Sequence, residues 1–328
     1  MTGFRVTDRR RVTATSSFPR PRSIPDPRPR VPYGPIKKIM ERAWHQVSTH
    51  LRRGLESGTL PSPRWTYVWG LALSARQTYR AVTVLVADRQ KPTTMPLQAS
   101  ILVRALLEVL GNLMALFDSP PAFDWFCADG HRSRTRQLRI QQELFGDRRD
   151  WQAWLAEMKR ASDDVATHCR LTDEERSNPN RILEWPAPYW LTRERMPSRR
   201  NPGHPRLIGP QRSVAFDLAY KYWYGELSSY AHQRASAAQM AIFADSPDDH
   251  WEPGALESSV VLGALMFFAA ILAELQVEIG APPSLALREL WIALGQLDQL
   301  AEMLLHGRYR RLLQLPDPAT SDQRIEPA

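Results

Sequence analysis

Two stripes of polar side chains, each repeating every four residues, are the parts of this sequence best suited to chemistry. The first stripe consists of Ser100, Arg104, Glu108 and Asn112, within an otherwise apolar segment from Met95 to Phe117. Residues four apart lie on one face of a helix, so this segment predicts a helix with a single polar face. A charged pair on a buried helix needs partners. We therefore expect Arg104 and Glu108 inside the protein, bonded to each other or to groups on another helix.

The second stripe lies further along the chain. It consists of Tyr220, Tyr224, Ser228, His232 and Ser236, again at a spacing of four. Buried polar groups have to find hydrogen-bond partners, and two polar stripes on separate helices satisfy this need by facing each other. We therefore expect the two helices to be in contact along their stripes.

The histidine makes an acid–base site one interpretation of these stripes. Histidine titrates near neutral pH, so His232 is the candidate proton-transfer group. Glu108 then orients the imidazole or stabilises its charge, and Arg104 holds an anionic group of the substrate with both arms of its fork. Tyr224 and Ser228 complete the candidate site. The alternative interpretation is a structural network that fixes helix register and carries out no chemistry.

Other catalytic and cofactor motifs are absent from the sequence. No cluster has the spacing of metal ligands, no glycine-rich phosphate loop occurs, and no GxSxG elbow is present. We therefore predict no cofactor and no metal. Cys127 and Cys169 are too few for a disulfide framework or a zinc knuckle, and we expect both to be buried as small apolar residues. So few cysteines favour a reducing compartment, which predicts a cytoplasmic protein.

The positive charge of the chain is concentrated at its N-terminus. Residues 1–33 contain eight Arg and two Asp, a net +6 of the total +8. This segment is rich in Arg, Pro and Ser and has almost no periodic apolar residues, so we predict a disordered tail. It is either a plain flexible arm or a weak electrostatic tether to RNA, DNA or an acidic partner. The chain contains 38 Arg and only 5 Lys, a preference typical of a GC-rich bacterial genome.

Hydrophobic periodicity predicts an all-α helical bundle. Apolar residues recur at helical spacing between proline and glycine breaks, and no segment alternates with a period of two. We expect helices at about residues 36–58, 62–88, 95–117, 122–144, 149–171, 213–243, 256–279 and 285–304. Residues 34–315 form the predicted domain, with a proline-rich irregular insertion at about 172–212 and a disordered tail at 316–328. The longest apolar run, Val260–Ala273, has 14 residues, which is short for a bilayer, so no membrane span is predicted.

The two stripes resemble the motifs of DUF5677, a bacterial family of helical proteins without an established activity. The shared features are the Arg-x-x-x-Glu pair in ILVRALLEVLGNL and the later Tyr-x-x-x-Ser-x-x-x-His. The connecting helices and the loop with Trp185 and Pro186 also look similar. The resemblance therefore spans about residues 40–245.

DUF5677 in turn resembles the HEPN superfamily, many of whose members are metal-independent RNases of toxin–antitoxin and phage-defence systems. The HEPN motif is Arg, four to six residues, then His, and His232 matches its histidine. The positions for the arginine hold Gly225, Glu226 and Leu227, so the motif is broken. Either Arg104 supplies the cation from another helix, or the protein lacks the RNase activity.

The resemblance implies a HEPN-like, RNA-directed protein that acts in defence or stress response. The alternative function is a non-catalytic helical interaction or scaffold module, in which both polar stripes are structural. These two functions allow three kinds of partner: RNA, another protein, or a second copy of the chain in a homodimer. Whether the protein is an enzyme stays open at this point.

Overall fold

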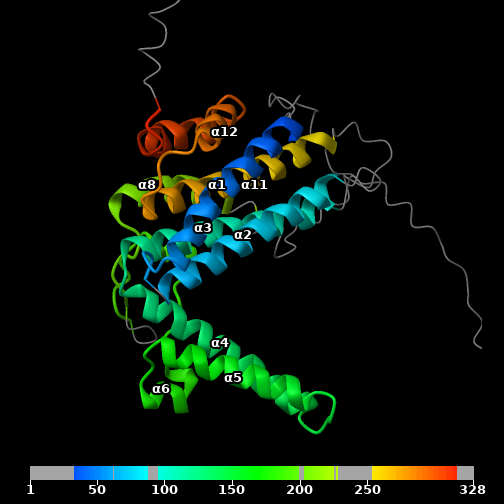
Figure 1. Ribbon diagram of the computed structural model, residues 1–328, viewed down its shortest axis with the longest axis vertical. Coiled ribbons are helices and arrows are strands. Elements are labelled where there is room, and N and C mark those ends of the chain that lie inside the picture. Colours follow the sequence, from blue (N-terminus) through cyan, green and yellow to red (C-terminus); the bar gives the residue numbers. More distant parts are fainter. Residues whose placement is uncertain are drawn as a thin grey trace, which may run out of the picture.

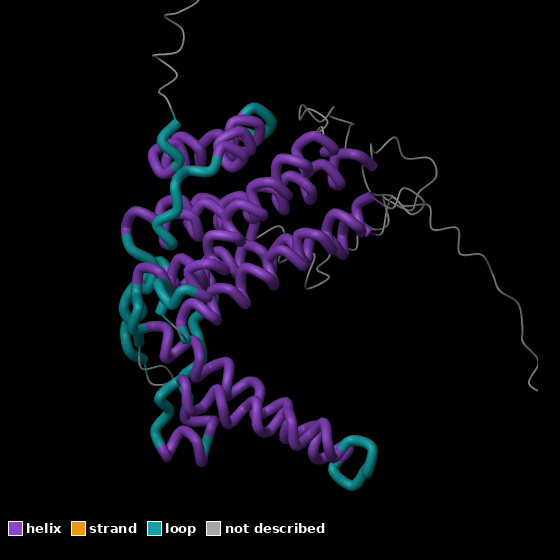
Figure 2. Tube along the Cα trace, viewed as in Figure 1, coloured by secondary structure: helices purple, strands orange, loops and turns teal. Residues whose placement is uncertain are grey.

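The computed structural model describes residues 33–61, 63–87, 95–198, 203–224, 227 and 253–315. These residues form helices joined by turns and loops, with one isolated antiparallel bridge between Arg195 and His204 and no strand in the described ranges (Figure 2). The all-α prediction is therefore confirmed. The predicted tails, 1–33 and 316–328, lie outside the described residues except for Tyr33, where the first helix begins.

Most of the core lies among long helices that pack side by side: α1 (Tyr33–Glu56), α2 (Arg64–Ala87), α3 (Met95–Asp118) and α11 (Pro253–Glu278) (Figure 1). Helix α3 packs against both α2 and α11, and α1 packs on α11. Every residue from Ser259 to Gln276 in α11 is buried. A helix that is apolar on all faces is stable only when neighbours cover every side, so the composition of α11 explains its central place.

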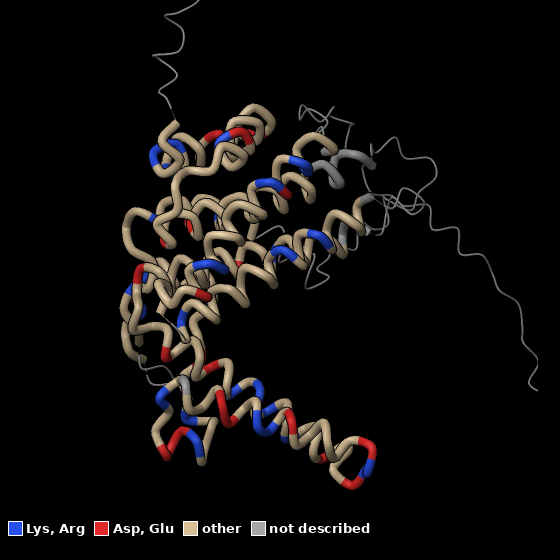
Figure 3. The backbone as a smooth tube through the Cα atoms, in the orientation of Figure 1, with Lys and Arg blue, Asp and Glu red and all other residues tan. Residues whose placement is uncertain are grey.

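Helices α4 (Ala122–Phe145) and α5 (Gln152–His168) pack on each other and form an arm that extends away from the bundle (Figure 1). A second, smaller core includes side chains from both α3 and the arm: Leu116, Phe123, Cys127, Ala166, Cys169 and Ile182. Both cysteines are buried free thiols, as expected. Positively and negatively charged residues are interspersed along the arm (Figure 3), which is typical of helices exposed to solvent.

The predicted irregular insertion at about 172–212 is partly helical. It contains the short helices α6 (Asp173–Ser177) and α7 (Pro188–Leu191) and the 3-10 turn η1 (Pro179–Arg181). The side chain of Thr172 accepts a hydrogen bond from the backbone N–H of Glu175, whose carboxylate accepts one from the Thr172 N–H at 2.9 Å. This capping box fixes the start of α6. Leu191 is fully buried against the bundle, so the prolines shorten the helices here without preventing packing.

Helix α8 (Pro210–Ala219) begins before the predicted start at residue 213. Pro210 occupies the first turn, where its missing N–H needs no partner. The chain continues as a π-helical turn, η2 (Tyr220–Tyr224). The remainder of the predicted helix, up to residue 243, lies outside the described residues apart from Leu227.

The prediction of a single helix at 285–304 is wrong, because the helix is interrupted between residues 295 and 299. The elements found there are α12 (Leu285–Gly295), α13 (Gln299–Leu304), the π-helical turn η3 (Leu305–Tyr309) and α14 (Arg310–Leu312). Asp298 causes the break. Its carboxylate accepts hydrogen bonds from the N–H groups of Leu300 at 2.8 Å and Ala301 at 3.1 Å, which caps a new helix.

In the described ranges, two segments are long and apolar enough to cross a membrane by length and composition: Gln98–Asp118 in α3 and Ser259–Glu278 in α11. The structure buries 61% of the first segment's most apolar window and 94% of the second's. The core helix of a bundle has the same length and composition, so these segments are weak evidence of a membrane span. The expected absence of a span stays a prediction.

Candidate functional site

Arg104 on α3 connects the two predicted polar stripes. Its Nε donates a 2.9 Å hydrogen bond to Oε1 of Glu108, one turn further along the same helix. Its Nη2 donates a 2.9 Å hydrogen bond to the hydroxyl of Tyr224 in η2. The guanidinium also lies over the Tyr224 ring, with Cζ 4.8 Å from the ring centre, where cation–π attraction acts. The structure therefore brings together three of the predicted site residues.

The other two predicted site residues, Ser228 and His232, lie outside the described residues. The described part of the site consists of Arg104, Glu108, Tyr224 and the side chains around them. The role of His232 in proton transfer stays a prediction.

The Arg104–Glu108 pair is only partly buried, which corrects the expectation that it lies inside the bundle. The side chain of Arg104 is 20% exposed and that of Glu108 is 37% exposed, whereas Ser100 is fully buried. Residues four apart on an α-helix are offset by about 40° around its axis, so a stripe of several steps winds from the core toward the surface. A partly exposed pair can reach a ligand, and it needs fewer protein partners than a pair in the core.

Two stacked tyrosine rings lie beside Arg104. The ring centres of Tyr220 and Tyr224 are 4.3 Å apart, with 19° between the ring planes. These residues are the two ends of η2, and single π-helical turns are frequent at functional sites. Burial and the neighbouring Tyr224 raise the pKa of Tyr220 to about 12, against the opposite effect of Arg104. Tyr220 therefore stays protonated near neutral pH and offers a hydrogen-bond donor rather than a base.

A second arginine and tyrosine pair adjoins the first. The guanidinium of Arg193 lies over the ring of Tyr189, with Cζ 4.0 Å from the ring centre, and that ring is 6.0 Å from the ring of Tyr220. Nη1 of Arg193 donates to the backbone carbonyl of Tyr189 at 2.7 Å and lies 3.3 Å from Oδ1 of Asp217. Tyr189 is 42% exposed. We call the following six side chains the Arg–Tyr surface: Arg104, Glu108, Tyr189, Arg193, Tyr220 and Tyr224.

Tyr189 and Arg193 were not among the residues predicted from the sequence, because they lie in the insertion and not in a periodic helix. The signal present in the sequence was the aromatic run Trp185–Trp190, which indicates packing but no role. Nε1 of Trp185 donates a 2.9 Å hydrogen bond to Oδ1 of Asn112, the last residue of the first stripe. This bond holds the insertion on α3, the helix that carries Arg104.

A buried ionic network lies around Glu274 in α11, and it too was not predicted. Glu274 is fully buried. Its carboxylate accepts hydrogen bonds from Nε of Arg212 at 2.7 Å and from Nε and Nη2 of Arg308 at 2.5 and 2.7 Å. Arg212 also pairs with Asp118 and Glu278. Burial alone would lower the pKa of Arg212, but these carboxylates raise it above its usual value. The network joins four elements, α3, α8, α11 and η3, so we interpret it as structural.

Neither a metal centre among the described residues nor a similar known protein indicates a function for this chain. In the described ranges, no three His, Cys, Asp or Glu side chains gather closely enough to hold a metal ion. Comparison of the chain with protein-family models, with curated proteins and with solved structures gave no match. The resemblance to DUF5677 and to HEPN proteins stays a prediction from the residue pattern. The Arg–Tyr surface is therefore the basis for a proposal about function.

Proposed function

We propose that the protein is a HEPN-like, RNA-directed protein of the bacterial cytoplasm that binds single-stranded RNA on the Arg–Tyr surface. The observation that carries the proposal is the pairing of arginines with tyrosine rings: Arg104 lies over Tyr224, and Arg193 lies over Tyr189. Unpaired RNA bases stack on aromatic rings and on guanidinium planes, and phosphates bond to arginine forks. The Arg–Tyr surface supplies all of these groups in one patch.

The carboxylates beside these arginines favour RNA over a simple anion. Glu108 pairs with Arg104 and Asp217 pairs with Arg193, so the local charge is close to balanced. Affinity then comes mainly from stacking and from directed hydrogen bonds. Carboxylate oxygens accept hydrogen bonds from 2′-hydroxyls and from base amino groups, both of which RNA presents. The Arg-rich segment 1–33 adds a sequence-independent attraction to phosphates.

Fluorescence anisotropy of the full chain with a labelled single-stranded RNA of mixed sequence tests this proposal. Tyr189→Ala removes an exposed ring, and a lost base stack is worth about 1–3 kcal/mol, so we expect affinity to fall about 5- to 150-fold. The matched control is Trp154→Ala on the α5 arm, an aromatic residue with 40% exposure against 42% for Tyr189. Equal RNA affinity of the wild type and Tyr189→Ala overturns the proposal.

A scaffold is the second candidate function, and one observation favours it. Glu108 and Tyr224 each bond to Arg104 at 2.9 Å, as expected of a network that fixes η2 on α3. The two functions differ in two measurements. For a scaffold, Tyr189→Ala leaves the RNA affinity unchanged, since only segment 1–33 attracts RNA, and Arg104→Gln unfolds at a lower urea concentration than the wild type.

A further inference from the structure

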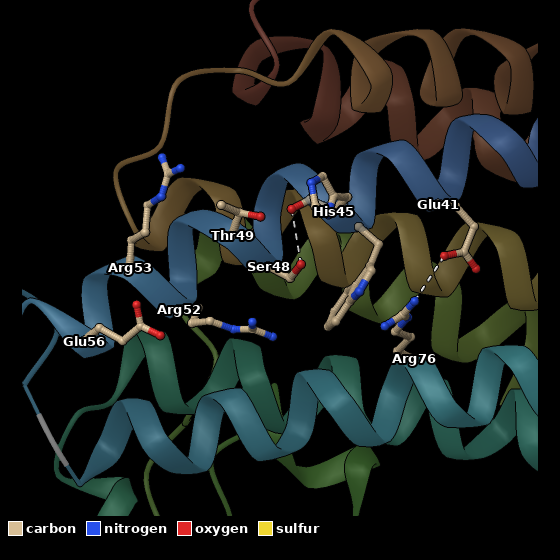
Figure 4. A pocket seen from close by; sticks show the side chains of 9 residues that line it. Glu41, His45, Ser48, Thr49, Arg52, Arg53, Glu56 and Arg76 are labelled. Atoms are coloured by element: carbon tan, nitrogen blue, oxygen red, sulfur yellow. Dashed lines mark hydrogen bonds and ion pairs between the residues drawn. The ribbon is translucent and has the colours of Figure 1, made fainter.

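A groove between α1 and α2 contains a group of arginines that the RNA proposal does not use (Figure 4). Its volume is about 480 Å³, and its lining includes Arg52 and Arg53 from α1 and Arg76 from α2. The Arg–Tyr surface, in contrast, is built on α3, η2 and the insertion. The groove is therefore a separate candidate site.

Two stacked tryptophans hold two of these arginines, Arg52 and Arg76, in place. The ring centres of Trp44 and Trp69 are 5.9 Å apart, with 11° between the ring planes. Arg76 lies over the Trp44 ring with Cζ at 5.0 Å, and Arg52 lies over the Trp69 ring with Cζ at 5.9 Å. Stacking on an indole restricts a guanidinium, which reduces the entropy lost when a ligand binds. The groove is therefore partly organised for binding before a ligand arrives.

The groove carries more positive than negative charge. Arg52, Arg53 and Arg76 outnumber the two carboxylates in its lining, those of Glu41 and Glu56. Nη2 of Arg76 lies 3.3 Å from Oε2 of Glu41, and both side chains are about one-third exposed. Arg52 and Arg53 form no hydrogen bond or ion pair with any residue that the structure describes. The N–H donors of Arg52 therefore have no acceptor in the described part of the chain.

Figure 4 shows that the charged groups are arranged in order along the groove. Arg52 and Arg76 extend from their two helices into the space between α1 and α2. Glu56 lies at the end near Arg52, and Glu41 lies at the end near Arg76. Each end of the groove therefore presents one guanidinium and one carboxylate.

We propose that this groove binds a phosphate monoester, with the phosphate on the guanidinium of Arg52 and the rest of the ligand extending toward Arg76 and Glu41. Guanidinium forks match the geometry of phosphate and form charge-assisted hydrogen bonds with it. The carboxylates of Glu41 and Glu56 accept hydrogen bonds from hydroxyl or amino groups, which a bare anion lacks. The ligand class is therefore a nucleotide or phosphorylated sugar, either free or at the 5′ end of an RNA. The volume of about 480 Å³ lies within the roughly 300–1,000 Å³ typical of small-molecule sites.

Isothermal titration calorimetry of the full chain with 5′-AMP, adenosine and inorganic phosphate tests the inference. We expect AMP to bind at least about tenfold more tightly than adenosine, because the phosphate supplies the charge-assisted bonds. Arg52→Gln should weaken AMP binding about tenfold or more, and Arg76→Gln should weaken it less. The matched control is Arg80→Gln, an exposed arginine one turn further along α2 and outside the groove, which should bind AMP like the wild type.

Two RNA hexamers, one with a 5′-phosphate and one with a 5′-hydroxyl, identify the source of the phosphate. If the phosphorylated hexamer binds more tightly than the hydroxyl hexamer, and Arg52→Gln removes this difference, the groove binds RNA ends. If AMP binds more tightly than the phosphorylated hexamer, the groove binds a free nucleotide. The inference is overturned if AMP binds no better than adenosine and the hexamers bind equally, or if Arg80→Gln loses as much affinity as Arg52→Gln.

Folding and the RNA proposal are controlled separately. Arg52 is exposed, and Arg52→Gln removes only its contact with the Trp69 ring, so the variant should melt close to the wild type by circular dichroism. The inference does not rest on RNA binding at the Arg–Tyr surface. Tyr189→Ala tests that surface and leaves the groove unchanged, so failure of one proposal is distinguishable from failure of the other.

Discussion

The guanidinium of Arg104 donates a 2.9 Å hydrogen bond to the hydroxyl of Tyr224, a residue 120 positions further along the chain. The bond joins the middle of α3 to the π-helical turn η2, and it places the Tyr224 ring against the guanidinium. Both ends of the bond come from the two polar stripes of the sequence. The two stripes are therefore in contact in the described part of the chain. The contribution of this contact to the free energy of unfolding can be measured.

Tyr224→Phe removes this hydroxyl and keeps the ring. Because Arg104 is partly exposed and still bonds to Glu108, we expect the free energy of unfolding to fall by only about 0.5–1.5 kcal/mol. RNA affinity should change little, since the stack on Tyr220 remains. Urea unfolding and fluorescence anisotropy measure the two effects. Tyr222→Phe, at a ring that is 53% exposed, is the control, and equal losses in both variants would show that the bond contributes nothing.

Glu274→Gln should be far more damaging than any change at the Arg–Tyr surface. The substitution removes the charge that Arg212 and Arg308 share in a fully buried position. Breaking a buried ion pair costs about 3–5 kcal/mol, because the remaining charges lose their compensation. Urea unfolding measures the loss. Glu302→Gln, at a side chain that is 56% exposed, should change stability by less than about 0.5 kcal/mol, and similar values for the two variants would argue against the network.

The Glu274 network shows what sequence patterns leave out. A glutamate within an apolar run indicates that it has partners, since a buried charge needs them. The pattern does not say which partners, because Arg212 is 62 residues away and Arg308 is 34 residues away. Periodicity detects pairs one turn apart on the same helix, such as Arg104 and Glu108. Pairs that form only when helices pack have no signature in the spacing.

Helix positions were easier to predict than the burial of individual side chains. The break at Asp118 to Pro120 is a local signal, so the predicted end of the third helix at Phe117 agrees closely with the observed end of α3. The winding of the first stripe around α3 requires knowledge of which face meets the core. For that reason Ser100 is buried as expected, whereas Glu108 is partly exposed.

Two glycine-to-alanine changes should have opposite effects on the stability of the protein. A Cβ at Gly111 in α3 would lie 2.7 Å from ring carbons of Phe216 and 3.1 Å from Leu191, so Gly111→Ala overpacks the contact with α8 and should cost about 1–3 kcal/mol. A Cβ at Gly130 in α4 would meet no atom within 4 Å. Gly130→Ala should therefore stabilise the protein by about 0.5–1 kcal/mol through helix propensity. Thermal unfolding of both variants checks the signs, and a neutral Gly111→Ala would contradict the close packing of α3 on α8.

His131 should make stability fall in mild acid. The ring is buried, and its Nδ1 lies 3.1 Å from the carbonyl oxygen of Ser162. Burial lowers the pKa of His131, and the hydrogen bond with Ser162 opposes this only in part. The unfolded state, with a histidine pKa of about 6.5, then binds the proton more readily than the folded state. The stability contributed by neutral His131 is therefore present above about pH 6.5 and is lost as the pH falls below that value.

Urea unfolding at pH 7.5 and pH 5.5 measures this effect. The wild type should lose more stability between the two pH values than His131→Gln, whose side chain does not titrate. His306→Gln, at a histidine that is 46% exposed, is the control for replacing an imidazole with an amide. Identical pH dependence of the wild type and His131→Gln would show that this histidine does not titrate differently on folding.

Catalytic and scaffold roles of the polar stripes make different predictions for His232→Ala and Glu108→Gln. If His232 transfers protons, its removal should lower the rate of RNA cleavage about 10²–10⁴-fold. Glu108→Gln keeps the shape of the side chain and removes its charge. Because Glu108 is 37% exposed, this change should cost less than about 1 kcal/mol of stability. A large loss of cleavage in Glu108→Gln would then come from lost chemistry and not from unfolding.

Cleavage of a mixed RNA pool and thermal unfolding, measured for the wild type and both variants, separate the two roles. The catalytic role predicts a wild type that cleaves RNA and variants that fold normally, bind RNA and cleave it slowly. A wild type that binds RNA without cleaving it would assign the Arg–Tyr surface to binding alone. In that case the absence of arginine at Gly225, Glu226 and Leu227 has a simple meaning. The chain would lack the cation that HEPN-like chemistry requires, and Arg104, held by Glu108 and Tyr224, would not replace it.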